Sequence, residues 1–170
     1  NNPAIFTPFA MPCNINFEKM AEIGYSMFYY ELLSETFQKL SAQQPEAYQG
    51  AWGLLREGIR KGLMVPLFHG REHLNLNVFE EKLAVRDHEV LTALKNRSYT
   101  SISSSGYDTI SPMAEFDFWN FEENQRFEEI IRDGLDAFET VYGYRANHFN
   151  PPGGREHPVI HKALKENGIT

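Results

Sequence analysis

A helical stretch that ends on glycine and runs directly into an apolar segment recurs four times along this chain. The glycines of these junctions are Gly24, Gly62, Gly143 and Gly168. Glycine just after a helix takes up the left-handed conformation without strain from a Cβ atom, so the chain can turn back there as a strand. Helices alternating with strands in this way predict βαβ units around a parallel sheet with right-handed crossovers. The sequence therefore predicts an α/β fold.

The individual elements follow from the spacing of apolar residues and from proline and glycine at element ends. The clearest amphipathic helix covers residues 122–142. Further helices are expected over residues 16–23, 45–62, 77–84, 87–94 and 158–167, and strands over 4–9, 63–68 and 144–149. Periodicity does not distinguish an open sheet from a closed barrel, but in both cases ligands bind at the carboxyl ends of the strands.

Composition limits the domain count and the classes of partner. A length of 170 residues, with 42% hydrophobic and 23% charged residues, is typical of one globular domain. The net charge of −7, without a dense run of Lys and Arg, argues against electrostatic binding to nucleic acid or to an anionic membrane. No apolar run approaches the roughly 20 residues of a membrane span. Cys13 is the single cysteine, so any metal is expected to have nitrogen and oxygen ligands.

Both ends of the chain suggest a fragment. The sequence opens without Met at Asn1, enters a strand-like segment at once, and stops after Gly168 where a strand is expected to begin. We therefore expect a single partial α/β domain over residues 1–170, in which missing segments or another copy of the chain cover the sheet edges. Residues 77–107 interrupt the helix–strand rhythm and are interpreted as an insertion that shapes access to substrate.

Two histidines four residues apart directly follow the apolar run of residues 63–68. His69 and His73 therefore lie at the carboxyl end of an expected strand. Imidazole is a common metal ligand, and one helical turn places residues i and i+4 on the same face. Catalytic zinc usually has three protein ligands, so this pair needs a third. A surface turn with two solvated histidines is the alternative.

A second constellation follows the helix of residues 122–142. After a short expected strand, Asn150-Pro151-Pro152-Gly153-Gly154 forms a rigid turn that should lie on the same rim as His69. In these motifs the chain resembles the NodB-homology polysaccharide deacetylases. His69 and His73 match the histidines of that family's H-[ST]-x-x-H motif, and residues 149–154 match its third motif. Gly70 stands where the family has Ser or Thr, and Asn150 where it has Arg.

The resemblance implies a parallel-stranded incomplete (β/α) barrel, here truncated at both ends, and a metal-dependent carbohydrate esterase. His69 and His73 would bind zinc or another divalent ion, with the catalytic aspartates expected before Asn1. The substrate would be a polysaccharide or amino sugar that carries N- or O-acetyl groups. Residues expected to contact it are Arg71, Asp117, Asn150, Pro151 and Gly153. Without the aspartates, the chain as given is expected to be inactive.

Several alternatives remain open at this stage. The chain could be a noncatalytic relative that keeps a carbohydrate groove, or His69 to His73 could be the H-x-x-E-H signature of an inverted zinc protease, which requires one continuous helix. Arg71 could form a surface ion pair, and Glu72 could pair with an arginine or be solvated. Asp117 could belong to a hydrophobic plug beside aromatic residues. His157 is expected to cap the helix that begins at Pro158.

Overall fold

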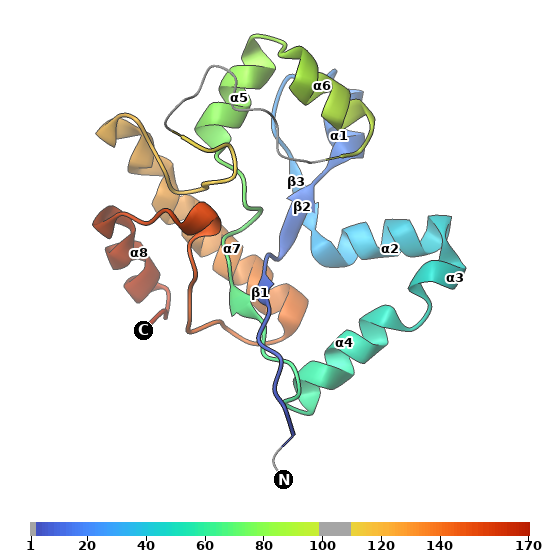
Figure 1. Cartoon of the computed structure of the whole chain (residues 1–170). Coiled ribbons are helices and arrows are strands. Elements are labelled where there is room, and N and C mark those ends of the chain that lie inside the picture. The colour runs from blue at the N-terminus through green and yellow to red at the C-terminus, as the bar shows by residue number, and fades with distance from the viewer. Residues whose placement is uncertain (1–2, 99–109) are drawn as a thin grey trace.

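Helices make up most of the structure, a computed structural model that describes residues 3–98 and 110–170 (Figure 1). Its α-helices are α1 (Phe17–Glu22), α2 (Leu33–Gln43), α3 (Pro45–Tyr48), α4 (Ala51–Arg60), α5 (Leu76–Ala84), α6 (His88–Lys95), α7 (Phe127–Tyr142) and α8 (His161–Glu166). The strands are β1 (Phe9–Ala10), β2 (Cys13–Ile15), β3 (Tyr30–Leu32) and β4 (Leu67–Phe68). Short 3₁₀ turns cover Phe121–Arg126, Pro152–Gly154 and Pro158–Ile160.

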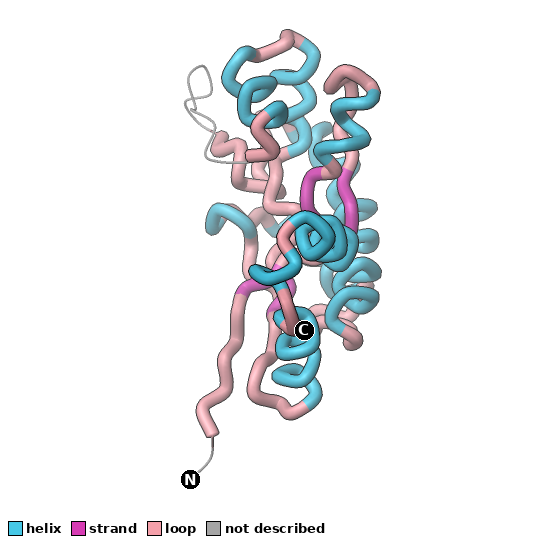
Figure 2. Tube along the Cα trace, turned by 90° about the vertical axis from the view of Figure 1, so that its right-hand side faces the viewer, coloured by secondary structure: helices cyan, strands magenta, loops and turns pink. Residues whose placement is uncertain are grey.

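The strands form two separate small sheets. β1 pairs with β4 in parallel, with Phe9 opposite Leu67 and Ala10 opposite Phe68. Single parallel bridges extend this pair, from Phe6 to Met64 and from Phe68 to Phe149. β2 pairs with β3 in antiparallel orientation. Figure 2 shows the strands as short pieces in a chain that is otherwise helix and loop.

The predicted α/β fold around a parallel sheet, and with it the incomplete (β/α) barrel, is therefore wrong, because the structure is rich in helix and has only two two-stranded sheets among the described residues. A closed barrel needs strands that pair on both sides over several residues, whereas parallel pairing within residues 3–98 and 110–170 is limited to one two-residue ladder and two bridges. Pro8 and Pro66 interrupt the two apolar runs that were read as strands, and proline has no N–H to donate to a ladder. Leu63 instead donates its backbone N–H to Gly58 O at 2.9 Å, which completes the end of α4.

The glycine stops are confirmed at all four junctions. Gly24, Gly62, Gly143 and Gly168 have φ angles of 65°, 66°, 85° and 97°. The expected helix over residues 45–62 is instead split into α3 and α4, because Gly50 adopts a φ of 76°. Neither α2 nor the β2–β3 pair was predicted from the sequence. β2 lies just before the first expected helix, and β3 and α2 lie between it and the second.

The centre of the core is the contact between α7 and β4. Phe68, Ile131, Leu135 and Phe138 are fully buried in it. Gly134 lets the helix approach closely, since a Cβ atom there would lie 2.9 Å from Phe68 Cζ. This packing fixes the position of β4. It thereby also fixes the start of the loop of residues 69–75, which carries His69 and His73 and is called the histidine loop below.

The region interpreted as an insertion contributes to the same core. Phe79 and Leu83 of α5 and Val90 and Leu94 of α6 are buried members of the hydrophobic cluster. In Figure 1 these two helices gather with α1 at the top of the molecule. The serine-rich loop of residues 101–106 lies outside the described residues.

The parallel pair has an exposed apolar edge. Ile5, Phe6 and Phe9 are 59%, 63% and 57% exposed. Coverage of this edge by another segment or a second copy stays a prediction. Within the described ranges, no helix has both the length and the apolar character needed to cross a bilayer.

Asp87 caps α6, and its replacement is expected to show a modest loss of stability that depends on pH. Its Oδ1 accepts a hydrogen bond from Val90 N at 3.0 Å. This bond, followed by the nearby Lys82, lowers the pKa of Asp87 despite partial burial. Asp87→Ala should reduce the free energy of unfolding by about 1 kcal/mol at pH 7. Because a lowered carboxyl pKa stabilises the fold only above the ordinary carboxyl pKa, the difference should shrink as pH falls through the folded value.

Urea unfolding of the wild-type chain and the variant at pH 7 and at pH 3 checks this prediction. Asp87→Asn retains an oxygen that can accept from Val90 N, so it serves as the control and should remain near wild-type stability at pH 7. A variant with alanine that unfolds at the wild-type midpoint would contradict the capping role.

Candidate functional site

The histidine pair lies on a loop, not on a helix. β4 ends at Phe68, and His69 N donates to Ala10 O at 3.1 Å. Gly70 and His73 have φ angles of 80° and 63°, so the chain turns sharply between the two histidines. The two imidazole rings meet with centroids 4.8 Å apart and an interplanar angle of 67°. A positive φ at a non-glycine residue costs free energy and is concentrated at functional sites.

The surroundings of His69 define which ring nitrogen carries the proton. His69 Nδ1 lies 2.8 Å from the backbone oxygen of Asn150. A carbonyl oxygen only accepts hydrogen bonds, so Nδ1 donates and Nε2 keeps its lone pair. Phe9 stacks on the same ring at 5.3 Å. Burial is the largest influence on the pKa of His69 and lowers it, which favours the neutral imidazole that metals bind.

The turn of residues 150–154, called the proline–glycine bend below, lies beside the histidine loop, as the sequence predicts. Asn150 N donates to Phe68 O at 3.0 Å, in register with the Phe68–Phe149 bridge. Pro152 is buried, and its Cγ would be 2.7 Å from a Cβ atom at Gly70. Asn150 and Pro151 are partly buried, whereas Gly153 is exposed. The structure thus brings both sequence motifs together on one rim.

Arg71 and Glu72 form a buried ion pair between the two histidines. Arg71 Nη2 donates to Glu72 Oε1 at 2.9 Å, and Nε donates to Oε2. The guanidinium also lies over the ring of Tyr30, 4.2 Å from its centroid. Arg71 and Glu72 are only 5% and 6% exposed. The sequence had left open a surface ion pair for Arg71. Arg71 does form an ion pair, but the pair is buried because the guanidinium points into the interior.

Glu115 is a member of the site that the sequence analysis missed. It is 1% exposed, and its Oε1 accepts from Arg71 N at 3.1 Å. Burial, followed by the nearby Glu72 charge, raises the pKa of Glu115 well above its ordinary value. The signal in the sequence was an acidic residue enclosed by Met113, Ala114 and Phe116, since an acid within an apolar run is either exposed or paired.

The remaining candidate residues make local contacts. Asp117 Oδ1 accepts from Phe118 N at 3.0 Å, within its own turn. The ring of His157 accepts from Val159 N at 3.2 Å, which confirms the predicted cap. His88 and His148 are exposed.

The two histidines are the candidate metal ligands of this site. Three buried side-chain polar atoms of the described residues lack a hydrogen-bond partner, and two of them, His73 Nδ1 and Glu115 Oε2, belong to this site. No set of three or more His, Cys, Asp or Glu side chains within residues 3–98 and 110–170 is arranged to hold a metal. The helix that the inverted zinc protease requires is absent from residues 69–75, so that alternative is not carried forward.

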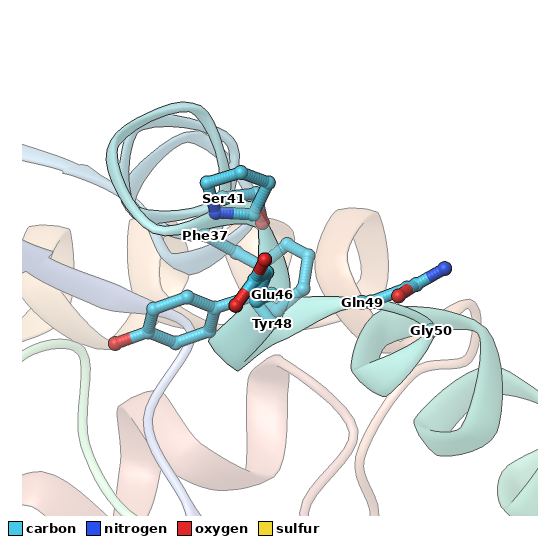
Figure 3. Close-up of a pocket in the computed structure, with 7 residues that line it drawn as sticks. Phe37, Ser41, Glu46, Tyr48, Gln49 and Gly50 are labelled. Atoms are coloured by element: carbon cyan, nitrogen blue, oxygen red, sulfur yellow. The ribbon is translucent and has the colours of Figure 1, made fainter.

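A separate hollow lies in the helical arm formed by α2, α3 and α4. Figure 3 shows the side chains that line it, which include Phe37, Ser41 and Tyr48. Ser41 Oγ is the third buried atom without a partner. None of the histidine-loop residues lines this hollow.

Comparisons of the chain with models of protein families, with curated proteins and with solved structures found no match.

Proposed function

We propose that this chain carries the metal-binding part of a carbohydrate deacetylase. The observation that supports this most directly is the Nδ1–H donated by His69 to Asn150 O at 2.8 Å, in a ring that also contacts His73. Metal-binding histidines usually donate the second ring nitrogen to a carbonyl or carboxylate, which fixes the tautomer and the ring orientation. Asn150 would play this supporting role here.

His69 and His73 would hold a divalent ion such as zinc. When bound, the ion supplies Lewis-acid chemistry for the hydrolysis of an N- or O-acetyl group. An aspartate outside the described residues would be the third ligand, as the resemblance to the deacetylases implies. The neutral state favoured for the half-buried His69 means that an ion would not have to displace a proton from it near neutral pH.

The carbohydrate would lie along the rim formed by the proline–glycine bend. Asn150 and Pro151 are partly buried beside the histidine loop, and Gly153 presents exposed backbone. The amide of Asn150 can both donate to and accept from sugar hydroxyls. Arg71 is not included among the sugar contacts, because its guanidinium is engaged with Glu72 and Tyr30 in the interior.

A noncatalytic carbohydrate-binding relative is the second candidate. It is favoured by Asn150, which lacks the fixed charge of the family's arginine and cannot orient a catalytic aspartate in the same way. Acetate release from acetylated oligosaccharides, with and without a chelator, separates the two. Chelator-sensitive release supports the deacetylase, and binding without any release supports the relative.

Removal of either histidine is expected to reduce zinc affinity by a factor of about 10 or more. Isothermal titration of the wild-type chain, His69→Ala and His73→Ala with Zn²⁺ measures the effect. His88→Ala is the matched control, because His88 is exposed on α6 and should leave the affinity unchanged. Equal zinc affinity in all four proteins would contradict the assignment of the ligands.

A further inference from the structure

We infer that Glu115 is the positioning residue that holds His69 and His73 in the geometry for metal binding. This inference rests on the proposed function, because it concerns the same pair of ligands. It assigns a role to a buried carboxylate that neither sequence motif contains, and that contacts the loop midway between the two histidines.

The first support is the hydrogen bond to the middle of the loop. Glu115 Oε1 accepts from Arg71 N at 3.1 Å, and the Arg71 side chain points away toward Glu72. Arg71 O in turn accepts from Cys13 N at 3.1 Å, at the start of β2. The peptide groups around Arg71 are therefore fixed on both sides, which limits the freedom of the residues that flank them.

The second support is the space beside Gly70. A Cβ atom at Gly70 would lie 1.8 Å from Glu115 Oε2, far closer than any van der Waals contact. The carboxylate thus occupies the volume in which a side chain at position 70 would begin. Glycine at position 70 therefore meets two requirements: the φ of 80° and the volume taken up by the Glu115 carboxyl group.

The third support is the anchorage of the turn that carries Glu115. Asn75 Nδ2 donates to Ala114 O at 2.9 Å and to Asp117 O at 2.8 Å, so the turn is bound to the end of the histidine loop. On the other side, Gly153 packs so closely that a Cβ atom there would lie 3.1 Å from Ala114 Cα. Glu115 is therefore held relative to both the loop and the proline–glycine bend.

Two variants separate the position of the side-chain oxygen from the ability to ionise. Glu115→Gln keeps the length of the side chain and an oxygen that can accept from Arg71 N, but it cannot ionise. Glu115→Asp keeps a carboxyl group, but the shorter side chain draws it away from the loop. A positioning role predicts Zn²⁺ affinity within about threefold of wild type for Glu115→Gln and a loss of about 10–100-fold for Glu115→Asp.

Glu31→Gln is the matched control for the loss of a buried carboxylate. Glu31 is 5% exposed and is paired with Lys39 and Thr36, neither of which belongs to the histidine loop. It should leave Zn²⁺ affinity unchanged whatever its cost in stability. Thermal unfolding of each variant establishes that the affinities refer to folded protein.

Amide hydrogen exchange gives a readout that does not depend on metal. In the metal-free chain, Glu115→Asp should accelerate exchange at Arg71 N–H by about tenfold or more, since that amide loses its acceptor. Glu115→Gln should keep the wild-type protection. The control Glu31→Gln should show no change at this amide.

The results distinguish failure of the inference from failure of the proposed function. Unchanged exchange at Arg71 in Glu115→Asp, or equal loss of affinity in Glu115→Gln and Glu115→Asp, overturns the positioning role. A wild-type chain that binds no Zn²⁺ overturns the proposed metal function, and the exchange measurement still decides whether Glu115 holds the loop.

Discussion

Replacement of Arg71 by methionine is expected to lower the free energy of unfolding by about 3–5 kcal/mol at pH 7, since it leaves a buried carboxylate without its partner. The side chains of Arg71 and Glu72 are 6% and 1% exposed, so water cannot replace the lost interaction. The double variant Arg71→Met/Glu72→Leu removes both charges and should lose less than Arg71→Met alone. Denaturant unfolding of the three proteins tests this expectation.

The pH dependence of the Arg71→Met variant gives a second measurement. Burial raises the pKa of Glu72, and the Arg71 charge opposes that rise. Without Arg71 the folded pKa should rise further, so the folded state takes up a proton that the unfolded state does not bind. Stability from a raised carboxyl pKa is present below the unfolded value and is lost as pH rises through the folded value. The variant should therefore be closer to wild type at pH 5 than at pH 7.5.

The exposed pair between Arg126 and Glu80 is the matched control for this experiment. Its side chains are 44% and 41% exposed. Arg126→Met should change the free energy of unfolding by less than about 1 kcal/mol. If Arg71→Met is no more destabilising than Arg126→Met, the buried pair does not stabilise the histidine loop.

Phe68→Ala is expected to have an effect of similar size, a loss of about 3–5 kcal/mol, because it leaves a cavity at the centre of the core. Phe68 is 0% exposed and packs against Phe138 and Phe149, with ring centroids 6.0 Å and 5.8 Å away. The side chain also fills the space that Gly134 leaves open in α7. Urea unfolding at pH 7 measures the loss.

Phe121→Ala serves as the control for Phe68→Ala. Phe121 is 61% exposed, so its truncation should cost less than about 1 kcal/mol. Because His69 directly follows Phe68, the Phe68→Ala variant should also bind Zn²⁺ more weakly than wild type. Equal unfolding midpoints for the two variants would mean that Phe68 is not the centre of the core.

The comparison of sequence and structure separates local from long-range features. The cap at His157 and most of the amphipathic helix predicted over residues 122–142 were predictable, because each depends on residues within a turn or two; the structure begins α7 at Phe127, after a 3₁₀ turn. The extent of the two sheets could not be predicted from the sequence. Apolar runs such as residues 63–68 are compatible with a long strand, and only their pairing partners decide how much of a ladder forms.

The candidate site shows the same division. The sequence located the two histidines and the proline–glycine bend, and it correctly expected them on one rim. It did not find Glu115, which contacts Arg71 across 44 positions of the chain. The structure brings the two imidazole rings together through positive φ angles at Gly70 and His73, without a helical turn between them.

By itself, the sequence determined where helices end, which helix faces are apolar and which residue types are available to bind a metal. These features depend on the conformational freedom of glycine and on the side-chain chemistry of neighbouring residues. Only the tertiary structure decided that Asn150 O orients His69, a contact across 81 positions of the chain, and that Glu115 fills the space beside Gly70. Such contacts arise when the core packs, because burial of Phe68 and α7 fixes distant backbone groups next to one another.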